Sequence, residues 1–192
     1  ISRTGFTGEL GYEIFSLGDQ TDHVSLWDKI IEIGNKHGME FSSTRSITIR
    51  RIEAGILGNL TDIDTNITPH QAGLEKIVDL NKNYFVGQKA IINSDKTRIL
   101  FGFTCKEKTP TSGSKIIYGN KVVGSITAGV HSPTLNCGVG YVRFNISGEW
   151  LNQNLEIEFN DGSRSSGKVV ELPFFDKEKT LLKGYKDKSL FE

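Results

Sequence analysis

Six short strand-like runs in the second half of the chain restrict its possible folds most strongly. They lie at 98–104, 114–118, 121–128, 138–144, 154–159 and 166–171. Two of the intervals between runs contain the pairs Gly119-Asn120 and Asp161-Gly162, which favour tight two-residue hairpin turns. Short strands joined by such turns pair antiparallel, and a closed sheet leaves no unpaired edge. We therefore expect an antiparallel β unit after residue 96, either a small barrel or a jelly roll.

The first half of the chain has a different pattern. Helices are expected at 22–34, 43–57, 68–72 and 87–92, and strands at 12–15 and 76–80. In the first helix, four apolar residues share one stripe that suits a buried face: Val24, Trp27, Ile30 and Ile31. The change of pattern at 95–97 predicts an α+β chain, with an α/β domain over 1–95 and a β-barrel domain over 96–192.

Charge and apolar content argue against two kinds of partner. Lys plus Arg and Asp plus Glu both number 23, whereas a nucleic-acid-binding surface needs a basic excess. No apolar run approaches the roughly 18 residues of a membrane span. The two cysteines, Cys105 and Cys137, are too few for a disulfide framework or a zinc cluster. We expect reduced thiols, which are compatible with a cytoplasmic protein, and neither nucleic acid nor membrane as partner.

No metal site is expected from the spacing of the acidic and histidine residues. Asp62 and Asp64 stand two apart near a turn, and no third ligand follows at calcium-loop spacing, so turn and capping roles are expected for both. The four histidines are scattered without zinc spacing. The chain opens on ISRTGFTGELGYEIF, without an initiator Met or a signal-peptide pattern. This opening suggests the middle of a folded unit, with an upstream segment before it.

Four stretches form a further pattern when they are taken in order. They are Arg3–Glu9 with Gly11–Ile14, Arg51–Gly55, the segment 62–90, and Ser132–Leu135 with Glu171–Phe175. Together they resemble the aminomethyltransferase family, whose best-known member is the T-protein of the glycine cleavage system. The resemblance covers the C-terminal half of such a protein. It implies three domains around a folate channel, with 1–95 forming most of the second domain and 96–176 the C-terminal barrel.

The resemblance implies folate-binding residues near the start of the chain. Glu13 follows the glycine-rich turn, where the family has its pterin-binding glutamate, and a carboxylate can accept the paired N–H donors of a pterin. Phe6 stands where glycine cleavage proteins usually have Tyr, and Phe15 is expected on the same strand face as Glu13, so either ring can lie beside the pterin. The alternatives are an exposed strand glutamate and two packing aromatics.

The resemblance assigns no catalytic residue to this chain. The family's catalytic aspartate lies in the N-terminal half, so the chain alone is expected not to turn over substrate. Arg51 and Glu53, two apart on a helix, are expected to pair with other elements. Ile47 occupies a position where glycine cleavage proteins have an arginine, which weakens the case for strict glycine cleavage.

The resemblance implies transfer of an aminomethyl or methyl group to tetrahydrofolate. Its expected partners are a small amine or methyl donor, the missing N-terminal half of the same protein and, as a further candidate, a lipoyl carrier protein. Three alternatives remain open. They are a folate-dependent demethylase of the dimethylsulfoniopropionate type, the folate-binding tail of a dimethylglycine or sarcosine dehydrogenase-like flavoprotein, and a folate-binding module that has lost catalysis.

Overall fold

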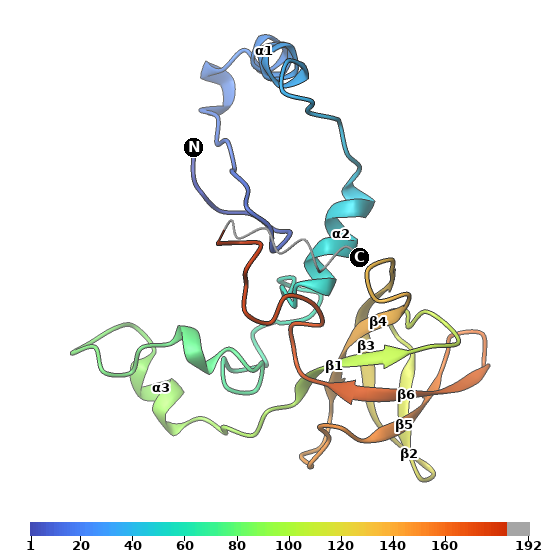
Figure 1. Cartoon of the computed structure of the whole chain (residues 1–192). Helices are drawn as coiled ribbons and strands as arrows, with labels where there is room; N and C mark the ends of the chain where they lie inside the picture. Colours follow the sequence, from blue (N-terminus) through green and yellow to red (C-terminus); the bar gives the residue numbers. More distant parts are fainter. Residues whose placement is uncertain (184–192) are drawn as a thin grey trace.

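The second half of the chain folds into a closed antiparallel barrel (Figure 1). A computed structural model describes residues 1–183 of the chain, and the expected α+β class with a C-terminal barrel is confirmed. The strand order around the barrel is β1-β4-β3-β2-β5-β6. The strands span Leu100–Cys105 (β1), Lys115–Tyr118 (β2), Lys121–Ser132 (β3), Cys137–Phe144 (β4), Asn154–Glu158 (β5) and Arg164–Val170 (β6).

The two expected hairpin turns lie where the sequence predicts them. Gly119, with φ 61°, stands between β2 and β3, and Gly162, with φ 80°, stands between β5 and β6. Both dihedrals are in the left-handed region that glycine adopts at little cost. β3 and β4 are joined by a third turn, so that Ser132 lies opposite Cys137. This last turn contacts a helix from the first half of the chain.

The barrel is filled by alternate side chains of its strands. Its fully buried members include Phe103, Ile116, Ile126, Val142 and Ile157. Near one end of the barrel, Phe144 and Trp150 stack with their ring centroids 4.5 Å apart. Burying each such side chain contributes on the order of 1.5–3 kcal/mol. The barrel therefore has a complete apolar core of its own.

Three α-helices and two short 3-10 turns lie before the barrel. The helices are α1 (His23–Asn35), α2 (Thr44–Glu53) and α3 (Gln88–Asn93), and the turns are η1 (Gly18–Gln20) and η2 (Glu75–Ile77). Asp22 caps α1 by accepting the backbone N–H of Ser25 at 3.1 Å, and Ser43 caps α2. None of the helices in residues 1–183 is long and apolar enough to cross a membrane.

Several elements of the first half differ from expectation. The strand expected at 12–15 is reduced to a single bridge between Ser2 and Glu13, and the strand expected at 76–80 begins instead with η2. Within residues 1–183, neither segment lies beside a strand with which it could form a ladder. The helix expected at 68–72 is only a turn, although Thr68 and Gln71 do form the reciprocal bonds of a capping box. α2 ends at Glu53 rather than residue 57, because the chain reverses at Gly55, whose φ is 69°.

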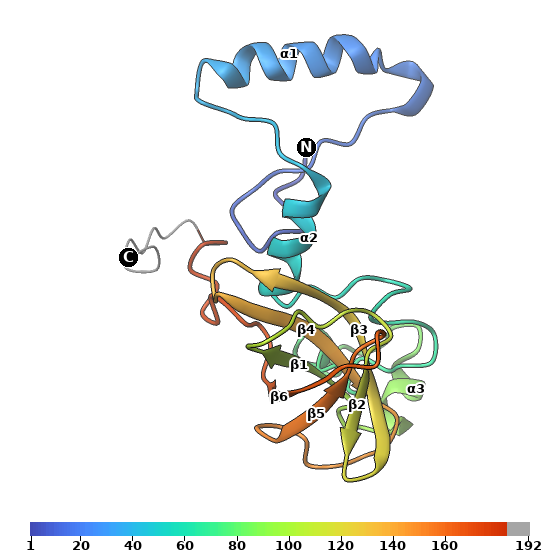
Figure 2. The same ribbon diagram turned by 90° about the vertical axis from the view of Figure 1, so that its right-hand side faces the viewer.

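α1 lies away from the rest of the described chain. Both views show it held away from the barrel at the end of two extended segments (Figures 1 and 2). Val24 and Trp27, expected on a buried stripe, are exposed, and Trp27 contacts the exposed Phe41 edge-on at 5.7 Å. No residue of α1 is buried within the described part of the chain. The helix predicted from the amphipathic pattern is present. The burial predicted for its apolar stripe is absent from residues 1–183.

Candidate functional site

The last turn of α2 joins the first half of the chain to the barrel. We call this contact, formed by Arg51, Ile52 and Glu53 with the barrel, the joint. The guanidinium of Arg51 donates to Oδ2 of Asp62 at 2.9 Å, and Asp62 is fully buried. The same carboxylate accepts the hydroxyl of Thr127 on β3 at 2.6 Å and the backbone N–H of Gly58 at 2.7 Å. Ile52 packs into the barrel wall beside Tyr141. Asp62 is therefore the partner of a buried arginine, and the pairing role expected for Arg51 is confirmed.

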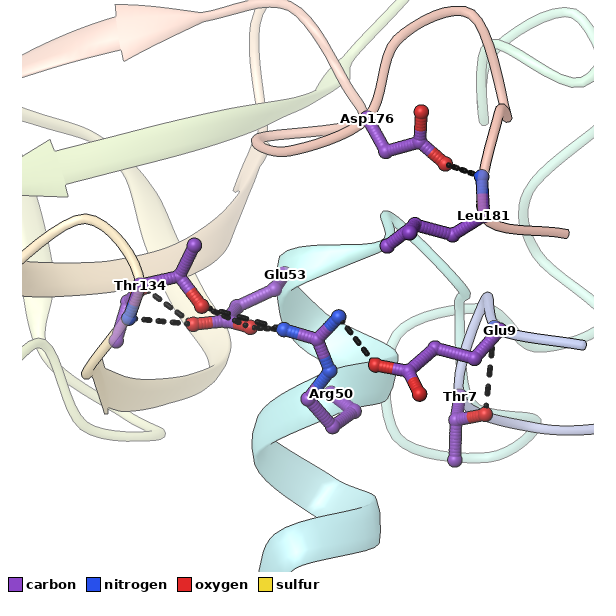
Figure 3. Close-up of polar contacts among 8 residues, drawn as sticks. Thr7, Glu9, Arg50, Glu53, Thr134, Asp176 and Leu181 are labelled. Carbon is purple, nitrogen blue, oxygen red and sulfur yellow. Dashed lines mark hydrogen bonds and ion pairs between the residues drawn. The ribbon is translucent and has the colours of Figure 1, made fainter. Parts of the chain in front are cut away.

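Glu53 is the second buried charge of this joint, with 1% of its side chain exposed. Its carboxylate accepts the hydroxyl of Ser132, at the end of β3. It also accepts the hydroxyl of Thr134 in the β3–β4 turn and forms an ion pair with Arg50 (Figure 3). Its backbone carbonyl accepts the N–H groups of Phe174 and Phe175 at 3.0 and 3.1 Å. Glu53 thus holds the turn and the segment after β6 against the end of α2, which confirms the pairing role expected for it.

Tyr141 completes the joint from the barrel side. Its hydroxyl lies 3.2 Å from the carbonyl oxygens of Arg51 and Ile52 and 3.0 Å from that of Ile56. Burial raises the pKa of this phenol well above its usual range. The hydroxyl therefore stays protonated and acts as a donor to the carbonyl groups at the end of α2.

Arg50 extends the same network to the start of the chain. One terminal nitrogen pairs with Oε1 of Glu9 at 2.6 Å, and the other pairs with Glu53 and lies 3.2 Å from the Thr134 hydroxyl (Figure 3). The guanidinium also lies over the ring of Phe175, 5.4 Å from its centroid. Glu9 belongs to residues 1–17, which fold back on themselves at the Ser2–Glu13 bridge and which we call the arm. Arg50 therefore connects the arm, α2 and the barrel turn.

A small pocket lies beside Arg50. Its volume is about 110 Å³, and its lining includes Thr7 and Gly8 of the arm, Ala54, and Asp176 of the segment after β6. Burial opposes ionisation of Asp176, but hydrogen bonds from Thr180 and Leu181 outweigh it and lower the pKa of this carboxyl. The pocket shows that the arm, α2 and the segment after β6 meet at one point.

The arm carries the three residues that the sequence assigns to folate. The backbone groups of Glu13 and Ser2 exchange two hydrogen bonds of 2.9 Å, and the Thr4 hydroxyl donates to Oε2 of Glu13. The ring of Phe6, 43% exposed, lies 5.7 Å from the guanidinium of Arg51. Phe15 is 70% exposed. Within residues 1–183, no hydrogen bond or ring contact joins these three side chains to one another.

Sequence analysis missed Tyr141, whose partners are distant in the chain, and Arg50, whose local pair with Glu53 gives no sign of its contacts with Glu9 and Thr134. The spacing from Arg50 to Thr134 is 84 residues, and that from Tyr141 to Arg51 is 90. Asp64, assigned to a turn, accepts the N–H of Asn66 and also pairs with Arg143 on β4 at 2.9 Å. The hydrogen bond from Arg143 lowers the pKa of Asp64. Local spacing carries no signal for such long-range partners.

The fold is found in a solved structure. The crystal structure of glycine cleavage system aminomethyltransferase T from Bartonella henselae superposes with a TM-score of 0.78. The match covers 92% of this chain and 49% of that chain, at 24% sequence identity. An antiparallel barrel joined to a helical segment with a glycine-rich arm therefore defines a protein of the T-protein fold class.

Sequence comparisons make the family explicit. Residues 1–82 match the family described as GCVT N-terminal domain, and residues 98–176 match the glycine cleavage T-protein C-terminal barrel domain. The aminomethyltransferase of Alkaliphilus oremlandii is 37% identical over 162 residues, which are 82% of this chain and 44% of the relative. That of Halothermothrix orenii is 34% identical over 180 residues, 91% of this chain and 49% of the relative. The chain belongs to the aminomethyltransferase family, and it spans about half the length of these relatives.

Proposed function

We propose that this chain supplies the folate-binding part of a tetrahydrofolate-dependent aminomethyltransferase. The names of the relatives support transfer of an aminomethyl group over the demethylase and flavoprotein alternatives. The amine donor, the remaining half of the fold and a lipoyl carrier protein are proposed partners of the complete enzyme. The proposed domain division is a first part over 1–95, which ends after α3 and in which strand pairing is limited to isolated bridges, and a barrel part from 96 onward.

The position of Glu13 is the observation that carries the proposal. Its backbone is held by the two bonds to Ser2, while its side chain is exposed at the end of the glycine-rich turn. Oε2 accepts the Thr4 hydroxyl, and Oε1 accepts no hydrogen bond from residues 1–183. A carboxylate on a held backbone with spare acceptor capacity fits a ring that presents an N–H beside an amine, and charge-assisted bonds of this kind are the strong ones.

The residues of the arm position the folate rather than perform the chemistry. When bound, tetrahydrofolate supplies the nucleophilic N5 that receives the one-carbon unit. Glu13 orients the pterin ring through its carboxylate, and the exposed rings of Phe6 and Phe15 offer apolar faces that can cover it from water. Fixing the reacting atoms in this way lowers the entropic part of the barrier. No catalytic role is assigned to the described residues.

Calorimetric titration of the protein with tetrahydrofolate tests the proposal. Glu13→Gln keeps the shape of the side chain but removes the charge and one acceptor, so binding is expected to weaken by about 1.5–3 kcal/mol, roughly 10- to 100-fold in Kd. Glu40→Gln, a substitution of an exposed glutamate outside the arm, serves as the matched control and is expected to leave binding unchanged. Absence of folate binding by the wild-type protein would sink the proposed function.

A further inference from the structure

We propose that Arg50 is a positioning residue that sets the arm, and with it Glu13 and Phe6, in register with the barrel. The effect on folate binding rests on the proposed function, whereas the effect on the arm does not. Within residues 1–183, a single ion pair joins the arm to the rest of the chain, and it lies between Glu9 and Arg50. The isolated bridge of the arm joins two of its own residues and does not attach it to the barrel. The other described contacts of the arm with α2 carry no ion pair: Gly8 lies against Ala54 at the end of the helix, and the ring of Phe6 lies beside Arg51.

The other end of Arg50 is attached to a rigid part of the molecule. Its partner Glu53 is buried and accepts hydrogen bonds from Ser132 and Thr134 at the β3–β4 turn. Figure 3 shows Glu53 between Arg50 and Thr134. This creates a continuous polar connection from Glu9 through Arg50 and Glu53 to the barrel. A guanidinium can serve two carboxylates at once, because its donors point in fixed directions from one plane. A lysine ammonium at the same position lacks this geometry.

The arm approaches α2 closely beside this ion pair. Gly8 has a φ of 74°, and a Cβ built on it lies 2.4 Å from the Cβ of Ala54. The backbone of the arm therefore rests directly on α2, where only glycine fits. The remaining contacts of the arm are weaker, such as the bond of 3.3 Å from Arg3 to the carbonyl of Leu182. The contact at Gly8 sets how closely the arm can approach α2. The ion pair of Glu9 with Arg50 opposes separation of the arm from α2.

The side chain of Arg50 is itself well held. It is 24% exposed, it lies over Phe175, and its two terminal nitrogens point to different carboxylates. Its Nε is buried without a hydrogen-bond partner in the described part of the chain, so the terminal nitrogens carry the polar contacts. Removing the charge of Arg50 would leave buried Glu53 without its cation, which destabilises the joint as a whole. Informative variants therefore keep a positive charge at position 50 or change only Glu9.

Amide hydrogen exchange read by NMR tests the inference on the protein itself. Arg50→Lys and Glu9→Gln are expected to raise exchange about two- to fivefold at the amides of Ser2 and Glu13. Glu9 lies within the loop that the Ser2–Glu13 bridge closes, so releasing Glu9 from Arg50 frees this loop to open. The amide of Val142, within the barrel, is expected to stay unchanged. Arg45→Lys, on the exposed first turn of α2, is the matched control and is expected to change neither.

Two results overturn the inference. One is unchanged exchange at Ser2 and Glu13 in both variants. The other is an equal rise at Val142, which would make Arg50 a residue of general stability. A parallel titration with tetrahydrofolate separates this inference from the proposed function. If exchange rises as expected and the wild-type protein binds no folate, Arg50 still positions the arm and the proposed function fails. If the wild-type protein binds, Arg50→Lys is expected to raise Kd by the same two- to fivefold factor.

Discussion

Replacing Glu53 by Gln tests whether the joint between α2 and the barrel is a main source of stability. The substitution keeps the volume of the side chain but removes a charge that is 1% exposed. It breaks the ion pair with Arg50 and puts an amide donor opposite the hydroxyls of Ser132 and Thr134. Breaking a buried ion pair costs about 3–5 kcal/mol. Because Arg50 retains 24% exposure and can still pair with Glu9, we expect the lower end, about 3 kcal/mol.

The loss is large enough to measure by urea and thermal unfolding followed by circular dichroism. For a chain of this size, about 3 kcal/mol corresponds to a fall in Tm of roughly 6–12 °C. Glu9→Gln is the matched control, since Glu9 pairs with the same arginine but is 48% exposed. Exposed ion pairs contribute about 0–1 kcal/mol, so this control is expected to shift Tm by no more than roughly 4 °C. Equal and small losses in the two variants would refute the assignment of stability to the buried carboxylate.

Three further predictions concern the same joint. Tyr141→Phe is expected to cost about 1 kcal/mol in urea unfolding at neutral pH, because it removes one donor to the carbonyl groups at the end of α2. Burial raises the pKa of Tyr141 in the folded state, so the stability of the wild-type protein should fall as pH rises above about 10, where the phenol ionises in the unfolded chain. The Phe variant should lose less over that range, and equal alkaline losses in both proteins would contradict this. Gly55→Ala is expected to lower the free energy of unfolding by at least roughly 1–2 kcal/mol, because φ is 69° and a Cβ there lies 3.0 Å from Cα of Pro173. An alanine variant as stable as wild type would show that the chain reversal tolerates a side chain.

Local pattern accounts for most of the elements that formed as expected. The strands of the barrel follow from alternation of apolar residues and from turns such as Gly119-Asn120, which act over a few residues. α1 follows from its apolar spacing and from the cap at Asp22. The segment 76–80 failed as a strand because a strand exists only when another strand lies beside it, and that depends on the whole fold.

The candidate site was only partly accessible from local pattern. Glu13 could be named because a glycine-rich turn leads into it and because the surrounding stretch resembles a known family. Arg50 could not be named from the sequence. Its carboxylate partners, Glu9 and Glu53, are brought together around it only when the arm and the barrel turn meet at α2. Asp62 looked like a turn residue for the same reason, since its partner Thr127 lies 65 residues away.

The amino-acid sequence by itself determined the class of the fold, the extent of the barrel and the family, because each depends on periodicity, turn residues and ordered motifs along the chain. Only the tertiary structure decided how the first half is attached to the barrel. Desolvation makes partners obligatory for the buried carboxylates of Asp62 and Glu53, and β3 and the β3–β4 turn supply hydroxyl donors to them. β4 adds the hydroxyl of Tyr141, which bonds the backbone carbonyls at the end of α2. Such pairing is a property of the folded chain, in which groups about 80 residues apart lie within hydrogen-bonding distance.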